Sequence, residues 1–255
     1  MLEIDPKKET EKIVRLLKST LKKTGLKKYI IGWSGGIDST VCLYLLTKAV
    51  PARQIHLLHM PYFETQINDL QELIKTHSFL HDIQIHEISI RNTVDQVWGT
   101  VSMPTITGKS VALTEKIDRV RKGNIIARVR MIILFDFSKK TNGLVCGTEN
   151  KTEQLLGYFT RYGDEASDIE PIRSLYKTEV FELAKYLGVP ENFINRKPSA
   201  NLWDGQTDEG EFGFTYKDAD SVLSGNLKGV SQEIIRKIEE RVKQNAFKHE
   251  VPYSL

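Results

Sequence analysis

Hydrophobic residues recur along the chain with two different periods, and the alternation between them predicts the fold class. Apolar, strand-like runs lie at about 28–33, 54–60, 83–90 and 143–147. Helical patterns lie between them, near 37–49, 66–80 and 124–140. This alternation indicates right-handed βαβ units and a mainly parallel sheet. The expected fold class is therefore α/β, a doubly wound, Rossmann-like sheet with helices on both faces.

Amphipathic helices are also expected near the two ends of the chain. Residues 7–24 place Ile13, Leu17 and Leu21 on one stripe, and residues 231–245 carry a similar stripe. A further helix is expected at 177–187. The two terminal stripes can cover the chain's own sheet or pack against a second copy, and the pattern alone leaves both alternatives open.

Three segments lack a clear period. Residues 91–123 contain a proline, small residues and many charges, and we expect a mobile segment over the functional site. Residues 158–176 and 196–215 are irregular and rich in Asp, Gly and Thr. There is no internal repeat that would indicate a solenoid.

Composition narrows the class of protein further. The 255 residues carry 36 basic and 33 acidic side chains, and a formal charge of +3 gives no indication of nucleic acid binding. No apolar run approaches the roughly 20 residues that span a bilayer. The charged N-terminus does not resemble a signal peptide, and Cys42 and Cys146 are expected to be buried, reduced thiols. We therefore expect a cytoplasmic protein that binds neither membrane nor nucleic acid.

The stretch "GWSGGIDST" follows the first expected strand and opens the next helix. Glycines let backbone N–H groups approach a phosphate, and the helix N-terminus adds partial positive charge. A carboxylate beside phosphates would repel them, so Asp38 is expected to bind a divalent cation. The alternative is a plain Gly-Gly turn with Asp38 and Ser39 capping a helix. The loop matches neither the Walker A pattern nor GxGxxG.

The string "SGGIDS" resembles the pyrophosphate-binding loop of the ATP pyrophosphatase superfamily. Several further motifs are similar to those of the ammonia-dependent NAD synthetases: "NIIARVRM", "VCGTENKTE", "GYFTRYGDEASDIEPI", "LYKTEVFELAKYLGVP" and "KPSANLWDGQTDE". The resemblance implies an adenine nucleotide alpha-hydrolase-like fold and a single synthetase domain over residues 1–255, with no glutaminase domain.

The resemblance also implies a reaction, which completes NAD biosynthesis. Such an enzyme is a carbon–nitrogen ligase (EC 6.3.1.5) that joins ammonia to deamido-NAD, using ATP and Mg²⁺. The nicotinate carboxylate attacks the α-phosphorus of ATP, pyrophosphate leaves, and ammonia displaces AMP from the adenylate. Adenylation supplies a good leaving group, and the protein mainly positions the partners and stabilises phosphate charge.

Site residues follow by resemblance, position by position, and none is assigned as a catalytic residue beyond the substrate and metal binders. The expected ATP-binding residues are Gly32, Trp33, Ser34, Gly35, Gly36, Ile37, Asp38, Ser39, Thr148, Lys177 and Ser199. The expected deamido-NAD-binding residues are Arg128, Arg161, Asp168, Phe247 and Lys248. The expected Mg²⁺ ligands are Asp38 and Glu153. The alternatives are a first-turn helix acid for Glu153, a helix cap for Thr148 and a solvated charge for Lys177.

Two positions depart from the family's usual pattern. Arg161 stands where the family often has Lys, and Phe247 stands where it often has His. The first change alters the reach of a cation, and the second removes a polar contact or replaces it by packing. The sequence does not choose between these outcomes.

The nitrogen source and the assembly state are also expectations from the resemblance. Glutamine-dependent relatives carry an N-terminal glutaminase domain, and Asp38 lies too near the start of this chain for one. We expect free ammonia as substrate, with a separate glutaminase partner left open, and a homodimer. Two competing functions are a tRNA thiolase of the same superfamily, which would need a reactive cysteine, and a nucleotide-binding module without activity.

Overall fold

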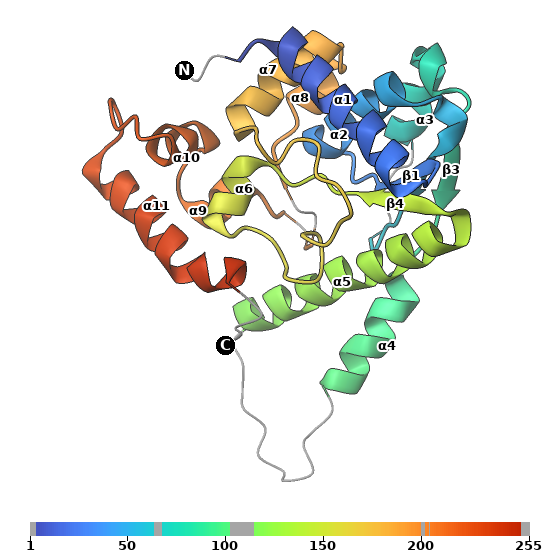
Figure 1. Ribbon diagram of the computed structural model, residues 1–255. Helices are drawn as coiled ribbons and strands as arrows, with labels where there is room; N and C mark the ends of the chain where they lie inside the picture. The colour runs from blue at the N-terminus through green and yellow to red at the C-terminus, as the bar shows by residue number, and fades with distance from the viewer. Residues whose placement is uncertain (1–3, 64–67, 103–114, 200–201, 204, 251–255) are drawn as a thin grey trace.

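The computed structural model describes residues 4–63, 68–102, 115–199, 202–203 and 205–250 (Figure 1). One sheet of four parallel strands lies at its centre, in the order β3-β2-β1-β4. The strands are β1 (Lys28–Gly32), β2 (Ile55–His59), β3 (Gln84–Glu87) and β4 (Gly143–Cys146). The predicted parallel α/β fold is confirmed.

The sequences of the strands agree with their places in the sheet. Every residue of β2 and β4 is buried, which suits near-continuous apolar strands covered on both faces. The edge strand β3 is largely exposed and carries alternate polar residues. Ile31 of β1 pairs with Leu57 on one side and Cys146 on the other.

Helices cover both faces of the sheet, and each face has its own core (Figure 1). One face carries α1 (Pro6–Thr24), α2 (Ile37–Ala49), α3 (Asn68–Thr76), α7 (Lys177–Leu187) and α8 (Glu191–Ile194). The other carries α4 (Arg91–Val101) and the long helix α5 (Glu115–Thr141). Short 3₁₀ turns lie at η1 (Ala52–Gln54) and η2 (Ser78–Leu80).

A third, smaller core lies beside the sheet and is built from the C-terminal part of the chain. Its helices are α6 (Lys151–Leu156), α9 (Asp208–Phe212), α10 (Tyr216–Leu223) and α11 (Gln232–Asn245), followed by the turn η3 (Ala246–His249). Leu156, Phe212 and Ile238 are buried together there. The small helices α8, α9 and α10 had no clear signal in the sequence.

The two terminal helices pack on their own chain. Ile13 and Leu17 of α1 are buried in the core of the sheet, and Gly25 ends the helix at φ 74°. Ile235 and Ile238 of α11 are buried, with Ile238 in the smaller core. The stripe of α1 thus covers the chain's own sheet as one alternative expected, whereas that of α11 packs on the smaller core beside the sheet.

The expectation of an irregular segment at 91–123 was wrong at both ends. Residues 91–101 form α4, and α5 begins at Glu115, nine positions before the expected start. Val94 is the buried residue of α4, so its apolar stripe is narrow, and the first turns of α5 are held by charged pairs such as Arg121–Asp118. Residues 103–114 lie outside the described part of the chain.

Chain order creates a switch point at the centre of the sheet. The chain runs outward from β1 to β2 and β3, then returns to place β4 on the other side of β1. Ligands of open α/β sheets bind beyond the carboxyl ends of the strands at such a point. The segments after β1 and β4, residues 33–36 and 147–150, flank it. Among the described residues, no helix is long and apolar enough to cross a membrane.

Candidate active site

The loop after β1 has the geometry of an anion-binding turn. Gly35 adopts φ 77°, a conformation that favours glycine, and Gly36 is the N-cap of α2 without any side chain to cap it. No side chain of the described residues caps α2 there, so the first N–H groups of the helix are available to an anion. The hydroxyls of Ser34 and Ser39 lie 3.2 Å apart beside them. The plain capped turn is not what the structure shows.

Two residues of this loop are structural. The ring of Trp33 is buried, its Nε1 donates to the hydroxyl of Thr40 at 3.2 Å, and Ile37 is also buried. Their side chains belong to the core, so only the backbone N–H and C=O groups of Trp33 and Ile37 could contact ATP.

Asp38, Glu153 and Lys177 meet at the switch point although they come from three different helices. The Nζ of Lys177 lies 2.5 Å from a carboxylate oxygen of Asp38 and 3.1 Å from one of Glu153. Lys177 is 1% exposed, so it is not the solvated charge that a lone lysine usually is. Both predicted metal carboxylates thus converge on one cation.

Burial and charge act in opposite directions on this trio. Burial alone would lower the pKa of Lys177, but the neighbouring carboxylates outweigh it and raise the pKa above its usual value. Burial raises the pKa of Glu153 to about 7, and the ammonium of Lys177 offsets part of that rise. The lysine is therefore held in its charged form.

Asn150 links the two loops of the switch point, and sequence reasoning missed it. Its side-chain amide donates to Asp38 at 3.0 Å, while its carbonyl oxygen accepts from the N–H of Glu153 and caps α6. Because Asn150 is the cap, Thr148 is not, and the half-buried Thr148 follows β4 at the end of the sheet. The Asn of "GTEN" before a helical run was the available signal.

A second missed group closes the site from the smaller core. The hydroxyl of Tyr216 lies 2.8 Å from Asp208 and 3.4 Å from Glu153, and the hydroxyl of Tyr158 lies 3.0 Å from Asp208. Asp208 is buried, which raises the pKa of its carboxyl. Asp208 lies within the "GQTDE" motif, which was the available signal, but it was not among the predicted site residues.

Gly147 follows β4 and is required by a close approach. A Cβ at this position would lie 1.9 Å from an oxygen of Glu170, whose carboxylate accepts from the N–H of Glu149 at 3.0 Å. Burial raises the pKa of Glu170 to about 7 and that of Glu149 to about 8, and the guanidinium of Arg173 offsets part of the shift for both. These buried acids fix the loop that carries Thr148 and Asn150.

Four of the five predicted deamido-NAD residues lie together. Arg128 of α5 donates from Nε to the carbonyl of Arg161 at 3.1 Å, and the Arg161 guanidinium lies 5.2 Å from the ring centre of Phe247. Lys248 donates to two carbonyls of the same loop. The fifth, Asp168, accepts from the N–H of Val145 at 2.7 Å and ties its segment to β4.

The remaining predicted residue, Ser199, is half-buried in the segment between α8 and α9. Arg196, three positions earlier, donates to the carbonyl of Gly35 at 3.0 Å and so brings this segment to the loop after β1. Gly32, at the end of β1, approaches Leu134 closely.

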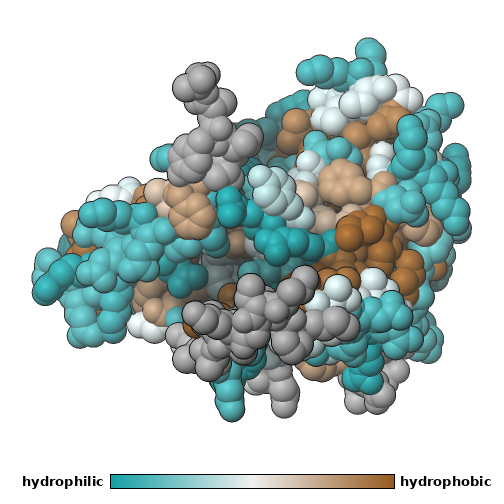
Figure 2. Space-filling view, turned by 90° about the horizontal axis from the view of Figure 1, so that it is seen from below, coloured by the Kyte–Doolittle hydropathy of each residue, from teal (hydrophilic) through white to brown (hydrophobic). Residues whose placement is uncertain are grey.

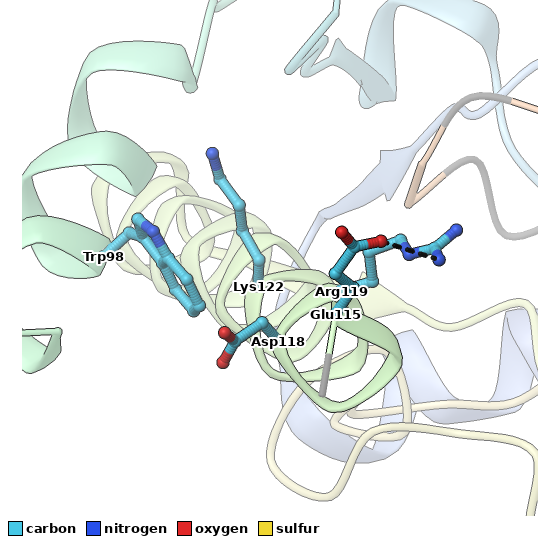
Figure 3. Close-up of a pocket in the computed structure, with 5 residues that line it drawn as sticks. All are labelled: Trp98, Glu115, Asp118, Arg119 and Lys122. Carbon is cyan, nitrogen blue, oxygen red and sulfur yellow. Dashed lines mark ion pairs between the residues drawn. The ribbon is translucent and has the colours of Figure 1, made fainter. Parts of the chain in front are cut away.

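A separate pocket of about 390 Å³ lies between α4 and the start of α5 (Figure 3). Its lining residues are Trp98, Glu115, Asp118, Arg119 and Lys122. None of them is a predicted site residue. The ammonium of Lys122 lies 5.9 Å from the Trp98 ring centre and pairs with Asp95 at 3.1 Å, so the cation is already partnered.

Comparisons with known proteins agree with this site. The family described as NAD synthase matches residues 9–252. NH(3)-dependent NAD(+) synthetases of Thermoplasma acidophilum and Pyrococcus furiosus are 41% and 38% identical; the alignments cover 98% and 95% of this chain and 98% and 93% of those proteins.

Among solved structures, an NMN synthetase from Francisella tularensis is similar, with a TM-score of 0.85, 34% identity and 99% of both chains covered. The sequence match over residues 9–252 and the structural similarity over nearly the whole chain indicate the same family. This chain belongs to the NAD synthase family.

Proposed function

We propose that this chain catalyses the ATP-dependent amidation of deamido-NAD with ammonia, giving NAD, AMP and pyrophosphate. The observation that supports this best is the convergence of Asp38 and Glu153 on one cationic centre beside the uncapped N-terminus of α2. The curated relatives that are 35–42% identical carry the name NH(3)-dependent NAD(+) synthetase.

The two carboxylates suit Mg²⁺ as well as an ammonium. The Nζ of Lys177 already occupies a point within 3.1 Å of both, so a cation is held between them by hard oxygen donors. Among the described residues, no group of three or more His, Cys, Asp or Glu could hold a metal. Asp38 and Glu153 would therefore share Mg²⁺ with phosphate and water oxygens, and the ion would neutralise phosphate charge when bound.

The remaining residues would position the two nucleotides. The N–H groups of residues 37–39 and the hydroxyls of Ser34 and Ser39 can hold pyrophosphate oxygens, and the ammonium of Lys177 can pair with a phosphate oxygen. On the other side, Arg128 and Arg161 present cations to the second nucleotide. Holding the nicotinate carboxylate against the α-phosphorus converts a bimolecular step into a positioned one.

Transfer of oxygen tests this chemistry directly. If the carboxylate of deamido-NAD attacks ATP, one carboxylate oxygen leaves with AMP. With the carboxylate labelled by ¹⁸O, mass spectrometry should find one label in each AMP formed. Unlabelled AMP would show that water or another acceptor attacks ATP, and the proposal would fail.

A smaller substrate is the second candidate. The similar solved structure with the TM-score of 0.85 is titled an NMN synthetase, whereas an NH3-dependent NAD synthetase from Campylobacter jejuni has a TM-score of 0.77 at 32% identity, covering 99% of this chain and 100% of that one. The corresponding acid is nicotinic acid mononucleotide, which lacks the adenylate half. Ratios of kcat/KM for the two acids decide between them. We expect deamido-NAD to be preferred.

Free ammonia is proposed as the nitrogen source. Cys42 and Cys146 are buried free thiols, and burial raises the pKa of Cys42 well above its usual value, the reverse of what a nucleophilic thiol needs. These properties also disfavour the tRNA thiolase alternative. Ammonium should support NAD formation by the purified protein, and glutamine should not.

A homodimer is proposed as the assembly. Large apolar side chains are exposed along α4 and α5. They are Val97, Val101, Ile117, Val120, Ile132 and Phe135. The face of the molecule seen in Figure 2 carries a brown, hydrophobic patch among hydrophilic side chains. Exposed apolar patches are typical of protein–protein interfaces. Light scattering should give about twice the 29.1 kDa chain mass, and a monomer at micromolar concentration would contradict the proposal.

A cytoplasmic location is also proposed, from the family and from the two free cysteines.

A further inference from the structure

Three consecutive side chains of the turn η3 fasten it to one loop. The ring of Phe247 lies beneath the Arg161 guanidinium, Lys248 donates to the carbonyls of Gly157 and Phe159 at 2.6 and 2.9 Å, and the His249 ring lies 5.4 Å from that of Phe159. The turn η3 is thereby attached to residues 157–161, which are far from it in the sequence.

The Phe247–Arg161 contact joins the two positions identified above, by resemblance, as departures from the family pattern. The cation lies 5.2 Å from the ring centre, within the range of a cation–π contact. Arg suits this contact because its planar guanidinium can stack on a ring. Phe247 is 43% exposed, so burial in an apolar core does not explain the position of its ring. One departure therefore supplies the partner of the other.

The backbone next to Arg161 adopts an uncommon conformation. Tyr162 has φ 59°, which is unusual for a bulky side chain, and such conformations persist where surrounding contacts fix them. Its N–H donates to Glu165 at 3.2 Å, and the preceding carbonyl accepts from Arg128. Phe247 contacts the side chain of Arg161, which lies next to both of these hydrogen bonds.

We propose that Phe247 is a positioning residue, which holds Arg161 and the loop 157–163 in the geometry that binds the nicotinic acid nucleotide. The proposal rests on the function proposed above, because the ligand is that of the same site. It adds that binding depends on a ring at position 247, acting through Arg161, and that the ring itself makes no polar contact with the substrate.

The test uses the full chain with Phe247→Leu and Phe247→Trp. Loss of the ring should make the amides of the loop, such as Gly163 N–H bonded to Thr160, exchange about two- to five-fold faster in the unliganded protein. The KM for deamido-NAD should rise by a similar factor while kcat and the KM for ATP stay unchanged. In Phe247→Trp, which keeps an aromatic ring, the amide exchange rates and the KM for deamido-NAD should both stay at wild-type values. Phe79→Leu, at an equally exposed phenylalanine on η2, should change neither.

Coupling identifies the partner. If Phe247 acts through Arg161, Phe247→Leu should have little further effect in an Arg161→Gln background. Unchanged exchange in Phe247→Leu, equal increases in both KM values, full additivity with Arg161→Gln, or failure of Phe247→Trp to keep the wild-type values would each overturn the proposal. If the wild type amidates neither nicotinic acid nucleotide, the proposed function fails, and the exchange data still decide whether Phe247 holds the loop.

Discussion

The ammonium nitrogen of Lys177 lies 2.5 Å from a carboxylate oxygen of Asp38, although 139 positions separate the two residues. The two residues lie at the starts of two helices: Asp38 is in the first turn of α2, which follows β1, and Lys177 is the first residue of α7. The lysine reaches Glu153 as well. A cation is therefore built into the place where the family resemblance puts Mg²⁺.

Removing one carboxylate should abolish most activity without unfolding the protein. An amide is a much weaker Mg²⁺ ligand than a carboxylate, so Asp38→Asn should lower kcat by about 100-fold or more. Steady-state kinetics with Mg²⁺ titrated into the millimolar range measures this. Asp136→Asn, at an exposed acid on α5, is the matched control. Near-normal turnover of Asp38→Asn at saturating Mg²⁺ would remove Asp38 from the metal site.

Removing the lysine should destabilise the protein until a metal replaces it. Lys177→Met leaves two carboxylates together in a buried place, and breaking a buried ion pair costs about 3–5 kcal/mol. Urea unfolding in EDTA should show a loss of that order. Millimolar Mg²⁺ should then raise the melting temperature of Lys177→Met more than that of the wild type. An equal effect on both proteins would mean that the lysine and the ion do not share a site.

A methyl group at Gly147 should be poorly tolerated. The added Cβ would lie 1.9 Å from the Glu170 carboxylate, so backbone or side chain must shift, at a cost of about 1–3 kcal/mol. Gly99→Ala is the control, because Gly99 lies in α4 with open space around it. Chemical denaturation should show a loss for the first variant and none for the second. A neutral Gly147→Ala would show that Glu170 moves freely.

Stability should fall as the pH drops from about 6.5 towards 4 because of His56. Burial, then Lys28, then His86 lower the pKa of His56 to about 4. Lys28 lies 3.2 Å from its Nε2 and His86 3.0 Å from its Nδ1, and Lys140 lies over the nearby Phe137 ring. Between about pH 4 and 6.5 the imidazole of the unfolded chain binds a proton and that of the folded chain does not. The free energy of unfolding therefore rises with pH through this window, and the full contribution of His56 to stability is present above about pH 6.5.

The comparison of His56→Gln with the wild type measures that contribution. Urea midpoints taken every half pH unit between 7.5 and 4.5 should fall less steeply for the variant. Parallel curves would contradict the assignment and move the pH dependence to other groups.

Much of the fold was readable from the chain because short apolar strands alternate with helices. The run "YII" predicted β1, and "SGGIDST" predicted both the turn and the start of α2. The segment 91–123 was misread because α4 and the first turns of α5 bury few apolar residues. Charged pairs such as Arg121–Asp118 hold these turns, so the sequence there shows no helical period of hydrophobic residues.

The site was predicted in part, and what was missed depends on long-range geometry. Asp38, Glu153 and Lys177 were identified by resemblance and do come together. The bond from Asn150 to Asp38 spans 112 positions, and local sequence identifies Asn150 as a helix cap without revealing this second partner. The contact between Arg161 and Phe247 is another example, since each looked like an isolated departure.

The most direct measurement of the central claim is a mass-spectrometric assay of the purified chain with ATP, Mg²⁺, deamido-NAD and ammonium. The account predicts that NAD and AMP appear together in equal amounts, and that omitting either deamido-NAD or Mg²⁺ stops both. ATP consumption that proceeds at the same rate without deamido-NAD, or binding of ATP with no NAD formed, would contradict it.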